Sequence, residues 1–342
     1  MTDIRTPPKQ VKAFHDQLLD TIMGFVASQT IYCGVQLDLF THLRGQALTL
    51  SQLAELTRVD PRSLERLLTA AVSLGLLERR GDQYRNSPVA EMCLVKGSPH
   101  YFGDMVSYYI AYRYEPFAHT EEALRKNQPV VMAHWRDPYQ EEVVARHATQ
   151  AMENLSRPVG EMLAERLDLS RARRLLDIGG GSGAFARALA ERHPHLEAVI
   201  LDQPSVLKST EEFIASSPAA PRLRTWPADF HRDELPSGFD LAILSNIIHG
   251  FGASACRRLM GRVHQCLNPG GQVLVIDFYL DEDKGGPVFA ALFGLAAALL
   301  GIGARTYSRG EVRQWLEEAG FQDIRSQDLT PHTGLVQGTR AS

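Results

Sequence analysis

The chain has 342 residues, enough for about two domains, and 44% of them are hydrophobic, which is sufficient for two cores. A formal net charge of -4 and a pI near 6.3 argue against a broad basic surface for nucleic acid or for an anionic membrane. The four cysteines form no C-x-x-C pair and the N-terminus carries no apolar signal segment, so we expect a cytoplasmic protein with reduced thiols.

Residues 17–40 carry a largely helical apolar pattern. The pattern includes several small side chains, at Gly24, Ala27, Ser28 and Gly34. Small side chains allow a second helix to approach closely, so we expect this helix to pack on a symmetry mate.

Residues 48–88 predict a winged helix-turn-helix. Ser51 is the expected N-cap of the first helix. Asp60 and Pro61 open the second helix, Gly75 ends it, and a short hairpin follows.

Helix-turn-helix motifs often bind DNA, but the second helix offers only Arg62 and Arg66 to base edges, with Glu65 between them. The rest of this helix is apolar. We therefore expect residues 1–100 to be an all-helical winged-helix dimerisation domain that joins two subunits and binds no nucleic acid. A transcription factor that senses a small molecule is the alternative.

Residues 101–159 predict a helical connector that is rich in aromatic side chains. Aromatic residues at helical spacing usually belong to a core, but this connector leads into the second domain and is also suited to wall a site for a planar molecule. The candidates for such a wall are Met105, Tyr108, Tyr109 and Met152.

From residue 160 onward, apolar strands alternate with helices, which predicts an α/β fold with a Rossmann-like, doubly wound, mostly parallel sheet. Residues 175–202 have the pattern of a strand, a glycine turn, a helix and a second strand. Gly179 and Gly181 allow the backbone to come close to a ligand. Asp202 ends the second strand, where an acid holds the hydroxyls of a ribose.

The pattern Gly179-x-Gly181-x-x-Ala184 fits both a dinucleotide and S-adenosylmethionine. Asp177 discriminates between them, because a carboxylate beside a pyrophosphate is unfavourable whereas it suits an ammonium and a sulfonium. We therefore expect S-adenosylmethionine, with NAD as the alternative.

Two later sites fit a nucleoside and a proton transfer. Asp229 and Phe230 are suited to the adenine amino group and ring, unless Asp229 is an ordinary surface acid. His249 follows the buried strand 239–248, at the strand end where open α/β sheets bind ligands. A histidine there is either structural or a general base for a hydroxyl that attacks a methyl group, and we expect the base.

Residues 288–304 carry no charge but are too short to cross a bilayer, so we expect a buried helix that is either core or a wall of an apolar pocket. His193 and His195 have no matching carboxylate or cysteine cluster, so we expect no metal site.

Taken together, the chain resembles the class I S-adenosylmethionine-dependent O-methyltransferases, in particular the plant caffeate and bacterial polyketide enzymes. The motifs that carry the resemblance are LLDIGGGSGAF, LDQPSV, ADF, LSNIIHGF, NPGGQVLVID and WLEEAGF. The resemblance implies a homodimer that methylates hydroxyls of small aromatic or polyketide-like molecules, with His249 as base and Asn246 beside the acceptor. The cofactor contacts that it implies in the catalytic domain, residues 160–342, are Gly179, Asp202, Gln203, Asp229, Phe230 and Ser245.

The chain departs from this family in two places. The family commonly has Asp-Trp after its histidine and Glu before an Arg-Thr pair, whereas this chain has Gly250-Phe251 and Ala304. A carboxylate that orients the imidazole is therefore missing at these positions. The alternative functions are a C- or N-methyltransferase, or a hydroxylase or cyclisation catalyst that retains the cofactor without transferring its methyl group.

Overall fold

The computed structural model of the chain describes residues 8–129, 142–299, 301 and 303–341. The chain forms two compact units, Met1–Tyr112 and Arg113–Ser342. The boundary falls inside helix α6 (Gly103–Phe117), within the segment expected to be a connector. Residues 130–141 of that segment lie outside the described residues.

The first unit contains the predicted winged helix-turn-helix. Its elements are α1 (Pro8–Gln36), α2 (Leu39–His42), β1 (Leu48–Thr49), α3 (Leu50–Thr57), α4 (Pro61–Ser73), β2 (Leu77–Arg80), β3 (Gln83–Asn86), α5 (Pro88–Cys93) and most of α6. The hairpin β2–β3 is confirmed, and β1 adds a third strand to it because Leu48 pairs with Tyr84.

The expected N-cap of α3 is wrong. Thr49, not Ser51, caps the helix: the Thr49 hydroxyl accepts from the backbone N–H of Gln52, and the Gln52 side chain accepts from the backbone N–H of Thr49. An N-cap residue needs an extended backbone, which Thr49 has at the end of β1, whereas Ser51 lies inside the first turn.

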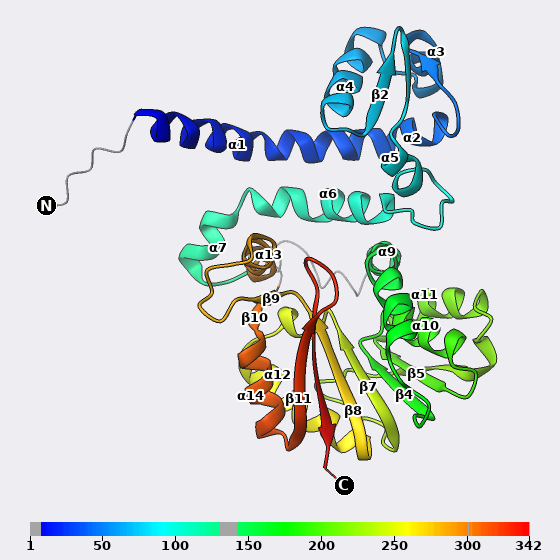
Figure 1. Ribbon diagram of the computed structural model, residues 1–342, viewed down its shortest axis with the longest axis vertical. Helices are drawn as coiled ribbons and strands as arrows, with labels where there is room; N and C mark the ends of the chain where they lie inside the picture. Colours follow the sequence, from blue (N-terminus) through cyan, green and yellow to red (C-terminus); the bar gives the residue numbers. More distant parts are fainter. Residues whose placement is uncertain (1–7, 130–141, 300, 302, 342) are drawn as a thin grey trace, which may run out of the picture. The chain divides into compact units, whose positions relative to one another are not determined.

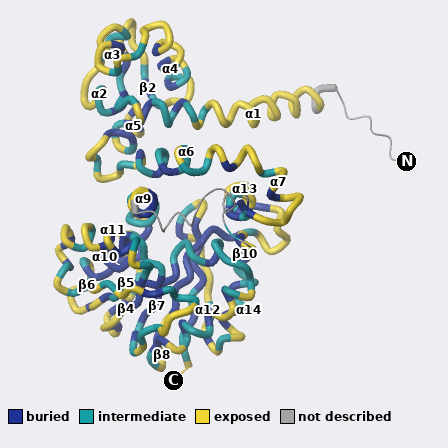
Figure 2. The backbone as a smooth tube through the Cα atoms, turned by 180° about the vertical axis from the view of Figure 1, so that it is seen from behind, coloured by how far each residue is buried: buried dark blue, intermediate teal, exposed yellow. Residues whose placement is uncertain are grey.

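Helix α1 is exposed over residues 11–26, and its buried residues lie near its C-terminal end, as Figure 2 shows. A Cβ at Gly34 would lie 2.6 Å from Cε2 of Phe40, so this glycine allows α1 to pack on α2. By length and composition alone, Val11–Gln36 is the one helical segment among the described residues that is long and apolar enough to span a membrane. The exposed large apolar side chains of α1 are Val11, Phe14, Leu18, Leu19, Ile22, Met23, Phe25 and Val26.

The second unit is built on a seven-stranded sheet with the order β11-β12-β8-β7-β4-β5-β6 (Figure 1). The five strands from β8 to β6 are parallel, and β12 pairs antiparallel with both of its neighbours, β8 and β11, which confirms the doubly wound, mostly parallel fold. The strands are β4 (Arg174–Ile178), β5 (Glu197–Asp202), β6 (Leu223–Pro227), β7 (Phe239–Ser245), β8 (Leu267–Asp277), β11 (Phe321–Asp328) and β12 (Gly334–Arg340).

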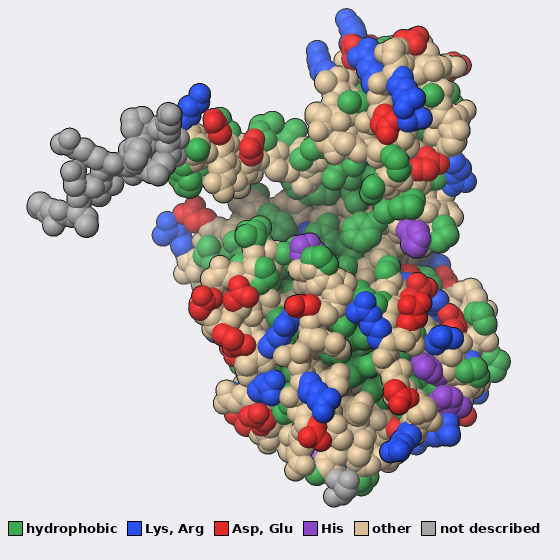
Figure 3. All heavy atoms as spheres, viewed as in Figure 1, with side chains coloured by type: hydrophobic (Ala, Val, Ile, Leu, Met, Phe, Trp, Pro, Cys, Tyr) green, Lys and Arg blue, Asp and Glu red, His purple; other side chains and the backbone are tan. Residues whose placement is uncertain are grey.

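Helices connect these strands, and a short two-stranded pairing joins β9 (Tyr279–Leu280) to β10 (Tyr307–Ser308). The helices are α7 (Thr120–Lys126), α9 (Glu142–Arg166), α10 (Ala184–Arg192), α11 (Pro204–Ala215), η2 (Ala220–Arg222), η3 (Ile248–Gly250), α12 (Ala253–Cys266), α13 (Val288–Ala298) and α14 (Arg309–Glu318). Figure 3 shows acidic and basic side chains interspersed over the visible face of this unit, and the basic side chains form no continuous patch on that face.

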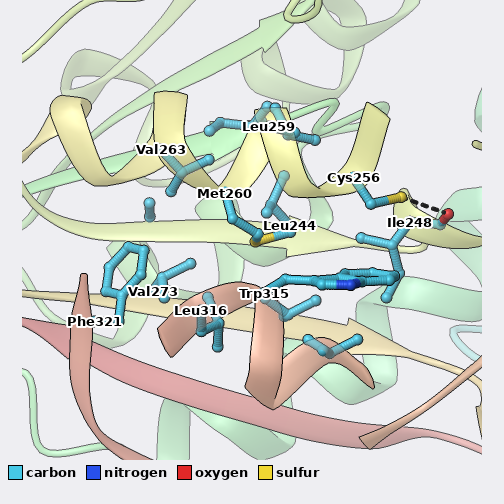
Figure 4. Close-up of a cluster of buried hydrophobic side chains, with 14 of the residues drawn as sticks. Leu244, Ile248, Cys256, Leu259, Met260, Val263, Val273, Trp315, Leu316 and Phe321 are labelled. Atoms are coloured by element: carbon cyan, nitrogen blue, oxygen red, sulfur yellow. Dashed lines mark hydrogen bonds between the residues drawn. The ribbon is translucent and has the colours of Figure 1, made fainter. Parts of the chain in front are cut away.

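Each face of the sheet carries its own core. Along β8, Val273 and Val275 belong to one cluster and Leu274 and Ile276 to the other, because successive side chains of a strand point to opposite faces. Helices α12 and α14 close the first cluster, in which Trp315 is the largest side chain (Figure 4). Helices α9, α10 and α11 close the second. The sheet therefore provides a rigid edge at the carboxyl ends of its parallel strands.

Helix α13 corresponds to the apolar segment 288–304, but only one of its faces is buried. Ala290, Gly294 and Ala297 are buried, whereas Val288 and Leu292 are exposed. The expectation of a buried helix is therefore wrong for half of its surface. A Cβ at Gly294 would lie 2.5 Å from Oγ1 of Thr306, so small residues on the buried face permit close packing.

Candidate active site

The glycine loop joins β4 to α10 and is open on one side. Gly179 and Gly181 have φ angles of +66° and +56°, in the left-handed region that favours glycine. A Cβ at Gly179 would lie 2.3 Å from Cδ1 of Ile247, in the segment that follows β7. A Cβ at Gly181 would meet nothing within 4 Å. The loop is thus pressed against the sheet edge at Gly179 and leaves room for a ligand at Gly181.

Asp202 is tied to this loop. Its Oδ2 accepts a hydrogen bond from the backbone N–H of Gly181 at 2.9 Å, and its Oδ1 accepts from Gln203 N–H at 2.7 Å. An ionised carboxylate has about four acceptor positions, so Asp202 can still accept hydrogen bonds from ribose hydroxyls. The structure therefore brings together three of the predicted cofactor residues. Burial raises the pKa of Asp202 to about 6.

Asp177 lies beneath the loop rather than on its open side. It is 1% exposed, and a Cβ at Gly180 would lie 2.9 Å from its Oδ2. Oδ2 accepts from Ala186 N–H at 3.4 Å, while Oδ1 is buried without a hydrogen-bond partner. Burial, and secondarily the charge of Asp202, raises the pKa of Asp177 to about 7. This placement indicates that Asp177 supports the glycine loop from beneath, and the effect of its carboxyl on a cationic ligand stays a prediction.

The predicted adenine residues converge on the same loop. The backbone N–H of Ala228 donates to the carbonyl of Asp202 at 3.0 Å, which places Asp229 just beyond the end of β5. Oδ1 of Asp229 accepts from His231 N–H at 2.9 Å. Cε1 of Phe230 lies 3.3 Å from the position of a Cβ at Gly179, so this ring reaches the glycine loop.

His231 is a neighbour that the sequence did not single out. Its ring centroid lies 4.7 Å from that of Phe230 and 4.2 Å from that of Phe251, and its Nε2 is buried without a hydrogen-bond partner. Burial lowers the pKa of His231, so the ring is favoured in its neutral form. The sequence gives no reason to select His231, because one histidine after the ADF motif belongs to no recognisable pattern.

Ser245 and Asn246 lie at the end of β7, beside the loop. Asn246 has φ +57°, a conformation that asparagine tolerates better than most residues. Its Nδ2 donates to Oγ of Ser245 at 3.3 Å, and its Oδ1 is buried without a partner. An unpaired buried acceptor at this edge fits a ligand that donates a hydrogen bond.

The imidazole of His249 is paired with a buried carboxylate. Nδ1 of His249 lies 2.7 Å from Oδ1 of Asp277, which is 28 residues further along the chain and 1% exposed. An ionised carboxylate only accepts, so Nδ1 carries the proton and Nε2 keeps its lone pair. Gly250 and Ala304 supply no carboxylate, as the sequence shows, but Asp277 at the end of β8 supplies one from another position. The sequence signal for this carboxylate was Asp277 itself, which is the last residue of the motif NPGGQVLVID.

The turn that carries His249 is held from three sides. The Cys256 thiol donates to the carbonyl of Ile248 at 3.3 Å, which Figure 4 shows as a dashed line. Arg305 N–H donates to the carbonyl of His249 at 3.0 Å, and Tyr307 donates its hydroxyl proton to the carbonyl of Phe251 at 2.5 Å. These three hydrogen bonds to backbone carbonyls fix the turn, and with it the imidazole, although Gly250 stands where the resemblance expects an acid.

The predicted wall residues come from both units, and their role as a wall stays a prediction. Met105, Tyr108 and Tyr109 lie on α6 in the first unit, and Met152 is half-buried on α9 in the second. His193 and His195 each contact a backbone carbonyl, of Ala164 and Leu169. In the described parts of the chain, no group of three or more His, Cys, Asp or Glu side chains is arranged to hold a metal ion.

Comparisons with known proteins show two matching families. Residues 116–322 match the O-methyltransferase domain, and residues 19–96 match the O-methyltransferase dimerisation domain. A 3-hydroxy-5-methyl-1-naphthoate 3-O-methyltransferase of Streptomyces sahachiroi is 34% identical over 328 residues, 95% of each chain. The tetracenomycin polyketide synthesis 8-O-methyl transferase of Streptomyces glaucescens is 35% identical over 338 residues, 98% of this chain and 99% of the relative.

Among solved structures, human N-acetylserotonin methyltransferase in complex with SAM is similar to this chain with a TM-score of 0.87 and 25% sequence identity. The similarity covers 100% of both chains.

Proposed function

This chain belongs to the S-adenosylmethionine-dependent O-methyltransferases, and from that premise we propose that it methylates a hydroxyl group of an aromatic, polyketide-type molecule with His249 as the general base. The two bacterial relatives support the acceptor class, since their names specify a naphthoate and a tetracenomycin polyketide. The observation that carries the role of His249 is its 2.7 Å contact with Asp277.

Bound S-adenosylmethionine would supply an electrophilic methyl group at its sulfonium. Nε2 of His249 accepts the proton of the acceptor hydroxyl as the hydroxyl oxygen becomes the nucleophile. Asp277 stabilises the imidazolium that results and keeps the ring in the tautomer that leaves Nε2 free. The His249 side chain is 18% exposed, so most of its surface is shielded from water.

The residues that would hold the cofactor fit it. Asp202 offers acceptor positions to the ribose hydroxyls, and Asp229 with Phe230 is suited to adenine. The open side of the loop at Gly181 leaves room for the amino-acid moiety of the cofactor. The unpaired Oδ1 of Asn246 is suited to a donor on the ligand or on the acceptor. Ser245 and Gln203 lie next to these groups in the chain and complete the proposed set.

A product assay tests this proposal. The purified enzyme is incubated with S-adenosylmethionine and a hydroxynaphthoate, and we expect S-adenosylhomocysteine and the methyl ether in equal amounts. A methyl group found on carbon or nitrogen, or conversion of the acceptor without release of S-adenosylhomocysteine, would contradict O-methylation of this acceptor class.

We further propose that the enzyme is a cytoplasmic homodimer joined through the first unit. The match to a dimerisation domain and the exposed apolar side chains of α1 support the dimer, because a monomer rarely exposes so large an apolar surface. The four free cysteines are consistent with a reducing compartment.

Ile22→Glu is expected to convert the dimer into a monomer in sedimentation velocity, because a charge would be buried unpaired in the interface. Ile22 is 61% exposed in the single chain. Leu124, which is 60% exposed on α7 of the second unit, provides the matched control, since Leu124→Glu should leave the dimer intact. A monomeric wild type, or an Ile22→Glu variant that stays dimeric, would contradict the proposed interface.

A further inference from the structure

A series of aromatic rings begins at His249. The Phe278 ring is stacked on the His249 ring, with centroids 6.0 Å apart and an angle of 24° between the planes. Phe293 of α13 meets His249 edge-on, with centroids 4.8 Å apart at 85°. These two rings confine the imidazole that Asp277 orients.

The series continues outward over two more rings. Phe289 meets Phe278 edge-on, at 5.0 Å and 72°, and is nearly parallel to Phe293, at 6.1 Å and 18°. His332 is stacked on Phe289 at 4.4 Å and 23°. His332 lies in the turn between β11 and β12, close to Gly334, which pairs with Asp277 across the sheet. Sheet register therefore brings this turn to the strand end that carries the catalytic carboxylate, and Figure 1 shows α13 at the same end of the sheet.

Exposure increases along the series. Phe278 is 3% exposed, Phe293 is half-buried, Phe289 is 38% exposed, and His332 is exposed. The outer pair is thus not part of a closed core. Flat aromatic faces that remain accessible beside a reactive group are typical of the walls of ligand sites, where they recognise planar molecules by stacking.

We propose that Phe289 and His332 form the outer wall of the acceptor site and select planar acceptors with two or more fused rings. This inference rests on the proposed function. Phe278 and Phe293 are the rings that contact His249 directly, so a single-ring phenol at His249 is expected to contact chiefly these two. A fused system extends outward along Phe289 and His332 and gains their stacking contacts.

The test compares three acceptors that present the same pair of neighbouring hydroxyls: catechol and the corresponding dihydroxy naphthalene and dihydroxy anthraquinone. In Phe289→Ala and in His332→Ala, kcat/KM for the two fused acceptors is expected to fall about five- to tenfold, mainly through KM, while kcat/KM for catechol changes less than about twofold. His332→Phe should restore the wild-type preference, because a phenyl ring keeps the stacking surface without the ring nitrogens.

Leu292→Ala is the matched control, since Leu292 is 63% exposed on the same helix but belongs to no ring contact. The inference is overturned if Phe289→Ala and His332→Ala lower kcat/KM equally for catechol and for the fused acceptors, or do not lower it. These results differ from a failure of the proposed function, in which no acceptor yields S-adenosylhomocysteine even with the wild-type enzyme.

Discussion

His249→Ala is expected to lower kcat by about 10²–10⁴-fold and to change the Kd for S-adenosylmethionine by less than about twofold. The alanine side chain removes the proton acceptor, whereas the residues proposed to hold the cofactor, in the glycine loop and at the ends of β5, β6 and β7, keep their side chains. Initial rates of S-adenosylhomocysteine release and calorimetric titration measure the two quantities independently.

Two further variants separate base catalysis from structural damage. Asp277→Asn should lower kcat about 10- to 100-fold while the imidazole remains, because an amide can also donate to Nδ1 and stabilise the wrong tautomer. His195→Ala should have no effect on kcat, since its ring contacts the carbonyl of Leu169 and the His193 ring, before the start of β5 and away from the end that carries Asp202. A His249→Ala enzyme that keeps its rate within about fivefold would show that the acceptor loses its proton without a general base.

Asp202→Ala is expected to weaken binding of S-adenosylmethionine and S-adenosylhomocysteine by at least about 100-fold, because the loss of hydrogen bonds to a charged acceptor costs about 1.5–3 kcal/mol each. The variant also releases the loop at Gly181. Calorimetric titration with both ligands and with NADH measures the loss and checks that the dinucleotide does not bind.

Asp240→Ala is the matched control for this variant. Asp240 also accepts backbone hydrogen bonds, from Arg173 and Arg174, but it lies at the opposite end of the parallel strands. Its replacement should cost stability without changing the Kd of either ligand. Undiminished binding by Asp202→Ala would exclude the ribose contact.

The same carboxyls make cofactor binding dependent on pH. Asp202 and Asp177 have pKa values raised from 3.8 to about 6 and about 7, chiefly by burial. Since a cationic ligand binds the ionised carboxylates more tightly, affinity should rise, by roughly tenfold, as pH increases from about 5.5 to 8. The stability of the free protein should change in the opposite direction. Because the folded-state pKa values are raised above 3.8, the free energy of unfolding should fall as pH rises from about 4 to about 7 and level off above that range.

Titrations across this range, repeated on Asp177→Asn, test the pH effect. The variant should show a flatter dependence, since the uncharged amide cannot ionise. An affinity that is independent of pH in the wild type would show that these carboxyls keep the same charge when the ligand binds.

Features of the fold that depend on local pattern could be predicted from the sequence. The spacing of apolar residues and the glycines between residues 175 and 202 predicted the strand, turn, helix and strand that the structure shows, and Asp202 and His249 were identified because they end or follow buried strands. The hairpin of the winged helix was likewise predicted from its turn residues. The end of a strand can be predicted from a sequence because the apolar run and the polar residue that follows it are neighbours in the chain.

Which of these residues lie together depends on the three-dimensional packing of the strands. Asp277 orients His249 because β8 lies beside β7 and both strands end at the same edge, a pairing that no local spacing encodes. His332 reaches the same edge through the antiparallel register of β12 with β8. Asp177 appeared suited to contact a ligand, but the turn of the loop covers it. These relations depend on strand order and on the path of the backbone, which result from the packing of the whole unit and not from any single segment.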